Sequence, residues 1–209
     1  MIRILHISDV HGDMDHFIAA CKEESDVVVF SGDFLPDPIQ LGFSPSGILR
    51  QEMFLLDNKA RIWEALDSRP FIYCQGNHDW INLDHLFYEK SYELKNTTLS
   101  LLEVNWHGFP NTPTLSFWNH YTENFTLVFE RIPKFADILV SHCPPKDILD
   151  EMYTGEHVGI EDLREQIENT SIRLCMFGHI HEANGMIQIG KIRYSNAARS
   201  WRVIEFNSE

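Results

Sequence analysis

The chain has 209 residues, of which 44% are hydrophobic, and a formal net charge of -14 at pH 7. This apolar content is enough for a packed core and excludes a disordered chain, and the length predicts one domain over residues 1–209. Proteins that bind the phosphate backbone of nucleic acids usually carry an excess of Lys and Arg. The acidic balance therefore argues against an extended nucleic-acid partner.

Four cysteines lie far apart in the sequence, and no Cys-x-x-Cys motif occurs. Cys74 and Cys175 lie inside apolar runs, so we expect buried free thiols rather than disulfides. The first residues lack a signal-peptide layout, and no apolar run approaches the roughly 18 residues of a membrane span. We expect a soluble, cytoplasmic protein without a membrane partner.

The first part of the chain alternates short apolar strands with helices. Asp13 is a suitable N-cap for the first helix. A strand–helix–strand–helix–strand series implies a largely parallel sheet in an α/β fold. We expect strands over 2–7, 26–30 and 70–74, and helices over 13–22 and 52–66.

The second part of the chain has a less regular pattern. Residues 34–48, with three prolines and two glycines, predict an irregular loop that forms a substrate rim. The sequence assigns no element between residues 105 and about 119, and the role of 105–125 stays open. Further on we expect a helix over 161–168 and strands over 97–104, 137–141, 172–177, 186–189, 191–195 and 202–206, the last three as successive antiparallel strands.

Polar side chains of the metal-ligand type follow five of the expected strands. Asp9 and His11 are two residues apart, so an extended backbone points both to one face, and His179 and His181 repeat this spacing. In open α/β sheets, ligands bind at the carboxyl ends of the strands. His6, within a strand, is expected to be a packed histidine. The set at strand ends is Asp9, His11, Asp33, Asn77, His78, His142, His179 and His181.

Mixed nitrogen and oxygen ligands without thiolates favour a first-row transition metal over Ca²⁺. Seven ligands are too many for one ion and suit two divalent ions, with a carboxylate such as Asp33 able to bridge them. Mn²⁺ is the first expectation, with Fe, Zn²⁺, Ni²⁺ or Mg²⁺ as alternatives. Two such ions can clamp the attacking and leaving oxygens at phosphorus, with a metal-bridging hydroxide as nucleophile.

The motif Gly76-Asn77-His78-Asp79 contains the one imidazole of this set that coordination does not need. His78 could donate a proton to the leaving oxygen or bind the phosphoryl oxygens. Asp79 could orient that imidazole or hold the turn. We therefore expect His78 and Asp79 to be catalytic.

These motifs together resemble the calcineurin-like metallophosphoesterase family, whose pattern is D-x-H, G-D, G-N-H-[DE], H and G-H-x-H. The resemblance implies a four-layer αββα sandwich with the site at the sheet edges, and it implies that Asn77 and His78 contact the substrate. It further implies two metal sites and a proton donor. One metal is held by Asp9, His11, Asp33 and His181, the other by Asp33, Asn77, His142 and His179, and the donor is His78.

Within that family, His142-Cys-Pro-Pro145 and Gly178-His-Ile-His-Glu182 look most like the small class III phosphodiesterases, the metallophosphoesterase-domain-containing proteins. That likeness implies hydrolysis of a small phosphodiester, such as a cyclic or short nucleotide. Cys143 is a departure, because that group usually has Gly there. A second departure is the run Asp33-Phe-Leu-Pro-Asp37, which lacks the Arg of phosphoprotein phosphatases.

Three other functions stay open. The same site could serve a phosphomonoesterase or, against the acidic balance, a nuclease. A non-catalytic interaction scaffold would require lost ligands, and none is lost. The sequence leaves open the native metal, the physiological substrate and the oligomeric state, and it offers Arg50, Asn196 and Arg199 as possible substrate contacts.

Overall fold

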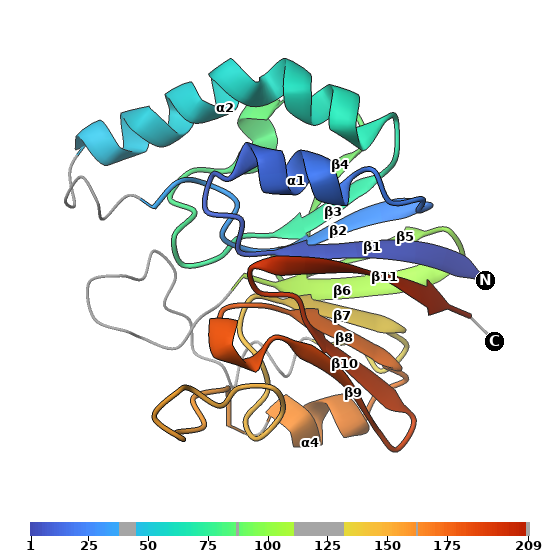
Figure 1. Ribbon diagram of the computed structural model, residues 1–209. Coiled ribbons are helices and arrows are strands. Elements are labelled where there is room, and N and C mark those ends of the chain that lie inside the picture. The colour runs from blue at the N-terminus through green and yellow to red at the C-terminus, as the bar shows by residue number, and fades with distance from the viewer. Residues whose placement is uncertain (38–44, 87, 111–131, 162, 208–209) are drawn as a thin grey trace.

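The computed structural model describes residues 1–37, 45–86, 88–110, 132–161 and 163–207. Two β-sheets pack face to face, and helices cover their outer faces (Figure 1). Helices α1 (Met14–Ala20) and α2 (Pro45–Leu66) lie over the first sheet, and α4 (Leu163–Glu168) lies below the second. This is the four-layer αββα sandwich that the resemblance implied.

The first sheet has the strand order β11-β1-β2-β3-β4. β2, β3 and β4 run parallel to β1, while β11 runs antiparallel to it. The strands are β1 (Ile2–Ser8), β2 (Val27–Ser31), β3 (Phe71–Cys74), β4 (Ser91–Glu93) and β11 (Ser200–Phe206).

The second sheet has the strand order β5-β6-β7-β8-β10-β9, in which β6, β7, β8 and β10 are parallel neighbours. The described residues also include two short 3₁₀ helices, Leu83–Leu86 and His181–Ala183. The strands are β5 (Thr97–Leu101), β6 (Val104–Phe109), β7 (Ile138–Ser141), β8 (Leu174–Phe177), β9 (Gly185–Ile189) and β10 (Ile192–Asn196).

Apolar side chains fill three layers. The central strands are buried on both faces, which explains their continuous β-branched and aromatic runs. Between the sheets, residues such as Ile4, Val29 and Ile72 meet Trp106 and Met176. Helices α1 and α2 bury their apolar stripes on the outer face of the first sheet, and α4 does so on the second. The carboxyl ends of the parallel strands of both sheets lie at the same edge of the sandwich, where His142, after β7, contacts the Ser31 carbonyl of β2.

Helix α2 begins earlier than the sequence predicted. Residues 45–48 belong to the helix, so the loop prediction was wrong for that part of 34–48. Pro45 stands at the first helical position, where its fixed φ and missing N–H are tolerated. Residues 38–44 of the predicted loop lie outside the described residues.

The single strand predicted over 97–104 is instead part of a hairpin. β5 and β6 pair antiparallel through a two-residue turn at Leu102 and Glu103, which have φ of 55° and 59°. Two positive φ values give the type I′ turn that matches strand twist. β6 also occupies 104–109, where the sequence assigned no element, while residues 111–131 lie outside the described part of the chain.

The last three strands do not form one antiparallel series. β9 and β10 form an antiparallel hairpin as predicted, but β10 then runs parallel to β8. β11 leaves this sheet and pairs with β1, from Ile2 opposite Phe206 to Ser8 opposite Ser200. Strand β4, at the edge of the first sheet, was not predicted.

Two local predictions, the cap of the first helix and the free buried thiols, are confirmed. Asp13 caps α1, because its carboxylate accepts a hydrogen bond from the His16 N–H at 2.9 Å. All four cysteines are buried and free. Among the described residues, no helix is both long enough and apolar enough to cross a membrane.

His6 links the two sheets. The imidazole is fully buried and lies 2.9 Å from the Ser31 hydroxyl of β2 and 2.9 Å from the Ser195 hydroxyl of β10. Burial lowers the pKa of His6 well below its usual value, so the neutral ring is the form that packs here. His6 is thus the packed histidine that the sequence predicted.

We predict that His6→Ala destabilises the protein by about 3–5 kcal/mol, because it leaves a cavity and removes a partner from two buried hydroxyls. Urea denaturation of the metal-free protein measures this. Glu205→Ala, an exposed change on β11, serves as the control and should cost less than about 0.5 kcal/mol. Equal effects of the two changes would contradict a linking role for His6.

Candidate metal centre

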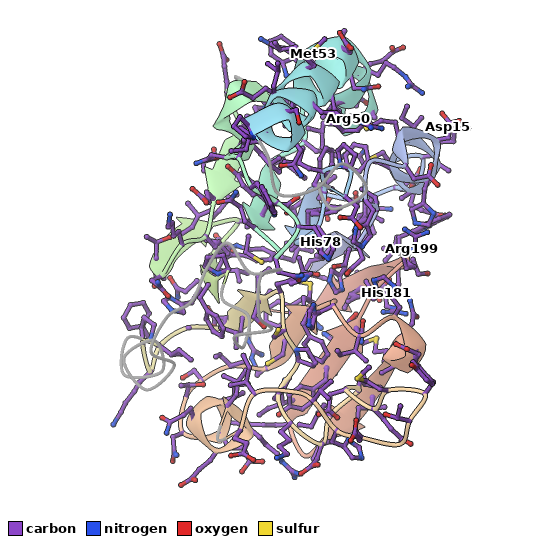
Figure 2. All side chains as sticks on the ribbon, turned by 90° about the vertical axis from the view of Figure 1, so that its left-hand side faces the viewer. Asp15, Arg50, Met53, His78, His181 and Arg199 are labelled. Carbon is purple, nitrogen blue, oxygen red and sulfur yellow. The ribbon has the colours of Figure 1, made fainter. Side chains whose placement is uncertain are left out.

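The loops that follow β1, β2, β3, β7 and β8 meet at one edge of the sandwich, the side that faces the viewer in Figure 2. Backbone hydrogen bonds join them. The Asp9 N–H donates to the Gly32 carbonyl at 3.0 Å, and the Gly178 N–H donates to the His142 carbonyl at 3.0 Å. Residues from distant parts of the chain are therefore held in a fixed relation.

Three of the predicted ligands form a first group, which consists of Asp9, His11 and His181. Asp9 Oδ1 lies 3.2 Å from His181 Nε2 and 3.9 Å from His11 Nε2. The ligand atoms of the group all lie within 4.8 Å of one another, a spacing that one ion can span.

A second group surrounds His142. Its Nε2 lies 3.3 Å from Asp33 Oδ2, 3.0 Å from Asn77 Oδ1 and 3.2 Å from His179 Nδ1. Asp9, Asp33 and His142 also satisfy the spacing of a metal site. Asp33 Oδ2 lies 3.8 Å from His11 Nε2 as well, so this carboxylate faces both groups, as a bridging ligand must. The structure thus brings together all seven predicted ligands.

One atom in the first group tests whether a metal fits. His11 Nε2 is buried, and no described residue gives it a hydrogen-bond partner, although it faces the carboxylates of Asp9 and Asp33. A buried polar atom without a partner is costly. A divalent ion between this nitrogen and the two carboxylates would satisfy all three, so the residues fit a metal.

The charges point the same way. Burial alone would raise the pKa of Asp33, but the neighbouring His142 holds that pKa well below its usual range. Burial alone would lower the pKa of His142, but Asp33 raises it to about 10. Without a metal, protonated His142 thus neutralises part of the buried negative charge. Metal binding would displace this proton, as it does wherever a ligand must be deprotonated.

The backbone of the ligand loops is strained. Asp9, His11, Asp33 and His179 have φ values of 55°, 46°, 60° and 70°. Non-glycine residues rarely adopt such values, and where they do the strain often lies at a functional site. Here all four of these residues belong to the candidate ligand set, so the strain lies where the ligand loops meet.

Two glycines permit the close approach of the ligand loops. A Cβ on Gly178 would collide with Ser8 Oγ and Asp9 Oδ2, and one on Gly76 would collide with Asp33 Oδ1. The glycines of the G-N-H and G-H-x-H motifs are therefore required by the packing of the carboxylates against the backbone.

Asp79 organises the backbone around Asp33. Its carboxylate accepts hydrogen bonds from the N–H groups of Asp33 and Leu35, each at 2.8 Å, and of Gly76 at 3.0 Å. Burial, reinforced by Asp33, raises the pKa of Asp79 to about 7. Of the two roles that the sequence left open for Asp79, these contacts correspond to holding the turn.

His78 lies at the rim of the centre. Its backbone N–H donates to Asp33 Oδ1 at 2.8 Å, and its ring lies 5.0 Å from that of His11. His78 Nδ1 lies 3.1 Å from Asp37 Oδ1. The sequence did not predict this contact, because Asp37 and His78 are far apart in the chain and Gln51 of α2 joins Pro36 to His78 through its amide.

Two further residues support the ligand loops. Ser8 donates a hydrogen bond to Asp9 Oδ2 at 2.5 Å and was not predicted to contribute. Asn196, offered above as a substrate contact, is fully buried, and its amide donates to the carbonyls of Ile180 and Leu149. In the structure it holds the loop that carries His179 and His181.

Comparison with known proteins agrees with this geometry. A family profile described as calcineurin-like phosphoesterase matches residues 2–183. Human metallophosphoesterase domain-containing protein 1 is 28% identical over 232 residues, covering 94% of this chain and 65% of that protein. The uncharacterized protein MJ1162 of Methanocaldococcus jannaschii is 25% identical, covering 90% of this chain and 84% of that protein.

The fold also has a solved counterpart. The crystal structure of TT1561 from Thermus thermophilus superposes with a TM-score of 0.64 over 97% of both chains, at 13% identity. Some sequence relatives match over a shorter stretch. UPF0046 protein K07C11.7 from Caenorhabditis elegans is 29% identical over 92 residues, which cover 44% of this chain and 29% of that protein.

The chain belongs to the calcineurin-like phosphoesterase family, whose members are metal-dependent hydrolases of phosphoesters. Its Asp and His side chains form candidate metal-binding groups at the place where both sheets present their strand ends.

We predict that Asp33→Asn loses more bound metal than any other single ligand substitution, because an amide cannot supply charge to two ions. Elemental analysis after dialysis against Mn²⁺ gives the metal content per chain. Asp13→Asn is the matched control, since Asn also caps helices well. Two metals bound at wild-type affinity in Asp33→Asn would exclude a bridging role.

Proposed function

We propose that this protein is a dinuclear metal-dependent phosphodiesterase that hydrolyses small cytoplasmic substrates, such as cyclic or short nucleotides, with Mn²⁺ as the preferred metal. The observation that carries the proposal is the division of the site residues. Seven side chains form two adjoining ligand groups around Asp9 and Asp33, while His78 lies beside them in contact with Asp37.

Bound divalent ions would supply Lewis acidity at phosphorus and an activated water. The chain's own residues supply the rest. The buried carboxylates of Asp9 and Asp33 provide the charge that holds cations. The Asp37 carboxylate lies 3.1 Å from Nδ1 and orients the ring of His78, which can give a proton to the leaving oxygen.

The preference for a diester rests on the residues that follow Asp33. Phe34 and Leu35 are fully buried in the core, where Phe34 packs against Phe17 and Phe30. This run therefore offers no guanidinium to a phosphate at the metal centre. A monoester carries one more negative charge than a diester. The absence of a cation from the run directly after Asp33 therefore disfavours the phosphomonoesterase alternative.

The preference for a small substrate rests on the cavity beside the centre. Its volume is about 740 Å³, and its walls include His11 and His181. This volume lies in the range of about 300–1,000 Å³ that is usual for sites of small ligands. Together with the net charge of -14, it supports a mononucleotide or short oligonucleotide rather than extended nucleic acid.

We predict that removal of bound metal abolishes hydrolysis of bis(p-nitrophenyl) phosphate and that Mn²⁺ restores it best. The reason is the mixed His, Asp and Asn ligand set. The assay compares Mn²⁺, Fe²⁺, Zn²⁺, Ni²⁺ and Mg²⁺ added to the same metal-free protein. Full activity in protein shown to be metal-free by elemental analysis would refute the mechanism.

We predict that His78→Ala keeps both metals but lowers kcat about 10²–10⁴-fold on a diester with an alkoxide leaving group. For a nitrophenolate leaving group the loss should be much smaller, since that anion leaves with little help from a proton. Equal losses on both substrates would exclude proton donation, and loss of metal would place His78 among the ligands.

Asp37→Asn separates the proton donor from its partner. This change keeps the size of the side chain but removes the carboxylate that contacts His78 Nδ1. We expect kcat to fall more for the diester with an alkoxide leaving group than for the nitrophenolate diester, the same pattern as for His78→Ala. Equal losses on both substrates would mean that Asp37 does not act through His78.

A further inference from the structure

The cavity beside the metal centre has walls from two distant parts of the chain. α2 contributes Arg50 and Phe54, the turn before β11 contributes Arg199, and His11 and His181 lie at the metal side. Figure 2 shows Arg50 on the helical side and Arg199 on the side of β11. A substrate in this cavity would therefore meet guanidinium groups from both parts of the chain.

These two arginines differ from the other arginines that the structure describes. Each of the others makes a hydrogen bond or ion pair, as Arg61 does with Asp15 at 2.8 Å and Arg202 does with Asn184 at 2.6 Å. Among the described residues, neither Arg50 nor Arg199 has such a partner. The chain has 31 acidic and 17 basic residues, so most arginines can find a carboxylate. Two arginines in one cavity without such a partner in the described part of the chain therefore point to a negatively charged ligand.

Neighbouring residues tie the backbone at both arginines to the centre. Gln51, next to Arg50, is buried, and its amide donates to the His78 carbonyl at 2.8 Å and accepts from the Trp80 N–H at 3.0 Å. α2 is thus tied to the loop that carries His78. Arg50 and Phe54, one helical turn apart, consequently present their side chains to the same cavity.

The turn that carries Arg199 is fixed in a similar way. Asn196 accepts a hydrogen bond from the Ala198 N–H at 2.9 Å and donates one to the Ile180 carbonyl at 2.9 Å, between the ligands His179 and His181. Arg199 itself has a φ of 56°, held by this turn. Both arginines are therefore attached to the loops of the metal centre.

Two carboxylates also line the cavity, but each already has a role. Asp13 caps α1 through the His16 N–H, and Asp37 contacts His78 Nδ1. The guanidinium groups of Arg50 and Arg199 offer donors to this cavity, and a guanidinium matches a phosphate with two parallel hydrogen bonds. Phe54 adds an aromatic surface against which a base or sugar can pack.

We propose that Arg50 and Arg199 select a linear phosphodiester that carries a second, terminal phosphate, such as a 5′-phosphorylated dinucleotide. This inference rests on the proposed function, since it places the scissile diester at the metal centre. The second phosphate then lies in the cavity that both arginines line, and one nucleoside spans the distance from the metal centre to that phosphate.

The test compares two substrates on each variant, thymidylyl-thymidine with and without a 5′-phosphate, in the presence of Mn²⁺. The readout is the ratio of their kcat/KM values, which cancels any general loss of activity. Because charge-assisted hydrogen bonds are strong, we expect the wild type to prefer the phosphorylated substrate by about 10-fold or more. Arg50→Gln and Arg199→Gln should each reduce this ratio severalfold.

Arg61→Gln is the matched control, because it removes the same charge from the same helix outside the cavity. It should keep the wild-type ratio. A wild-type ratio near one, or retention of the preference in either cavity variant, would overturn the inference while leaving the phosphodiesterase function in place. Failure of the wild type to cleave any diester, including bis(p-nitrophenyl) phosphate, would overturn both.

Discussion

The rest of the structure depends on two carboxylates buried where the sheets meet. Asp9 and Asp33 are at most 2% exposed, and an isolated carboxylate in such a place would be very costly. The surrounding imidazoles, the Ser8 hydroxyl and backbone N–H groups each reduce that cost. The glycines and the strained backbone of the ligand loops follow from the same requirement, because only close packing brings enough donors within reach.

The sequence could place the candidate site residues at one edge because their positions are coded locally. Each ligand follows a short apolar strand, and parallel strands place their carboxyl ends together whatever the intervening loops do. The i, i+2 spacing of Asp9 and His11 and of His179 and His181 needs only a few residues to specify. The layer architecture followed from the family resemblance and from the alternation of strands and helices in the first 74 residues.

What the sequence did not predict depends on contacts between distant residues. The Leu102-Glu103 turn lacks the Asn-Gly signal of a type I′ hairpin, so pairing of β5 with β6 determines its conformation. The contact between Asp37 and His78 and the place of Arg50 beside the centre come from the packing of α2 through Gln51. β11 could not be assigned to its sheet, since its alternating pattern suits either one.

The pairing of β1 with β11 has a consequence for biosynthesis. The His179 N–H that binds the Asp9 carboxylate, and the strand that completes the sheet of β1, are translated 170 or more residues after Asp9. Contacts of such long sequence separation form slowly, and an unpaired strand edge is prone to aggregation in the meantime. The nascent chain therefore carries an incomplete, acidic half-site while the intervening residues are translated, and it gains its full set of candidate ligands only once His181 has been added.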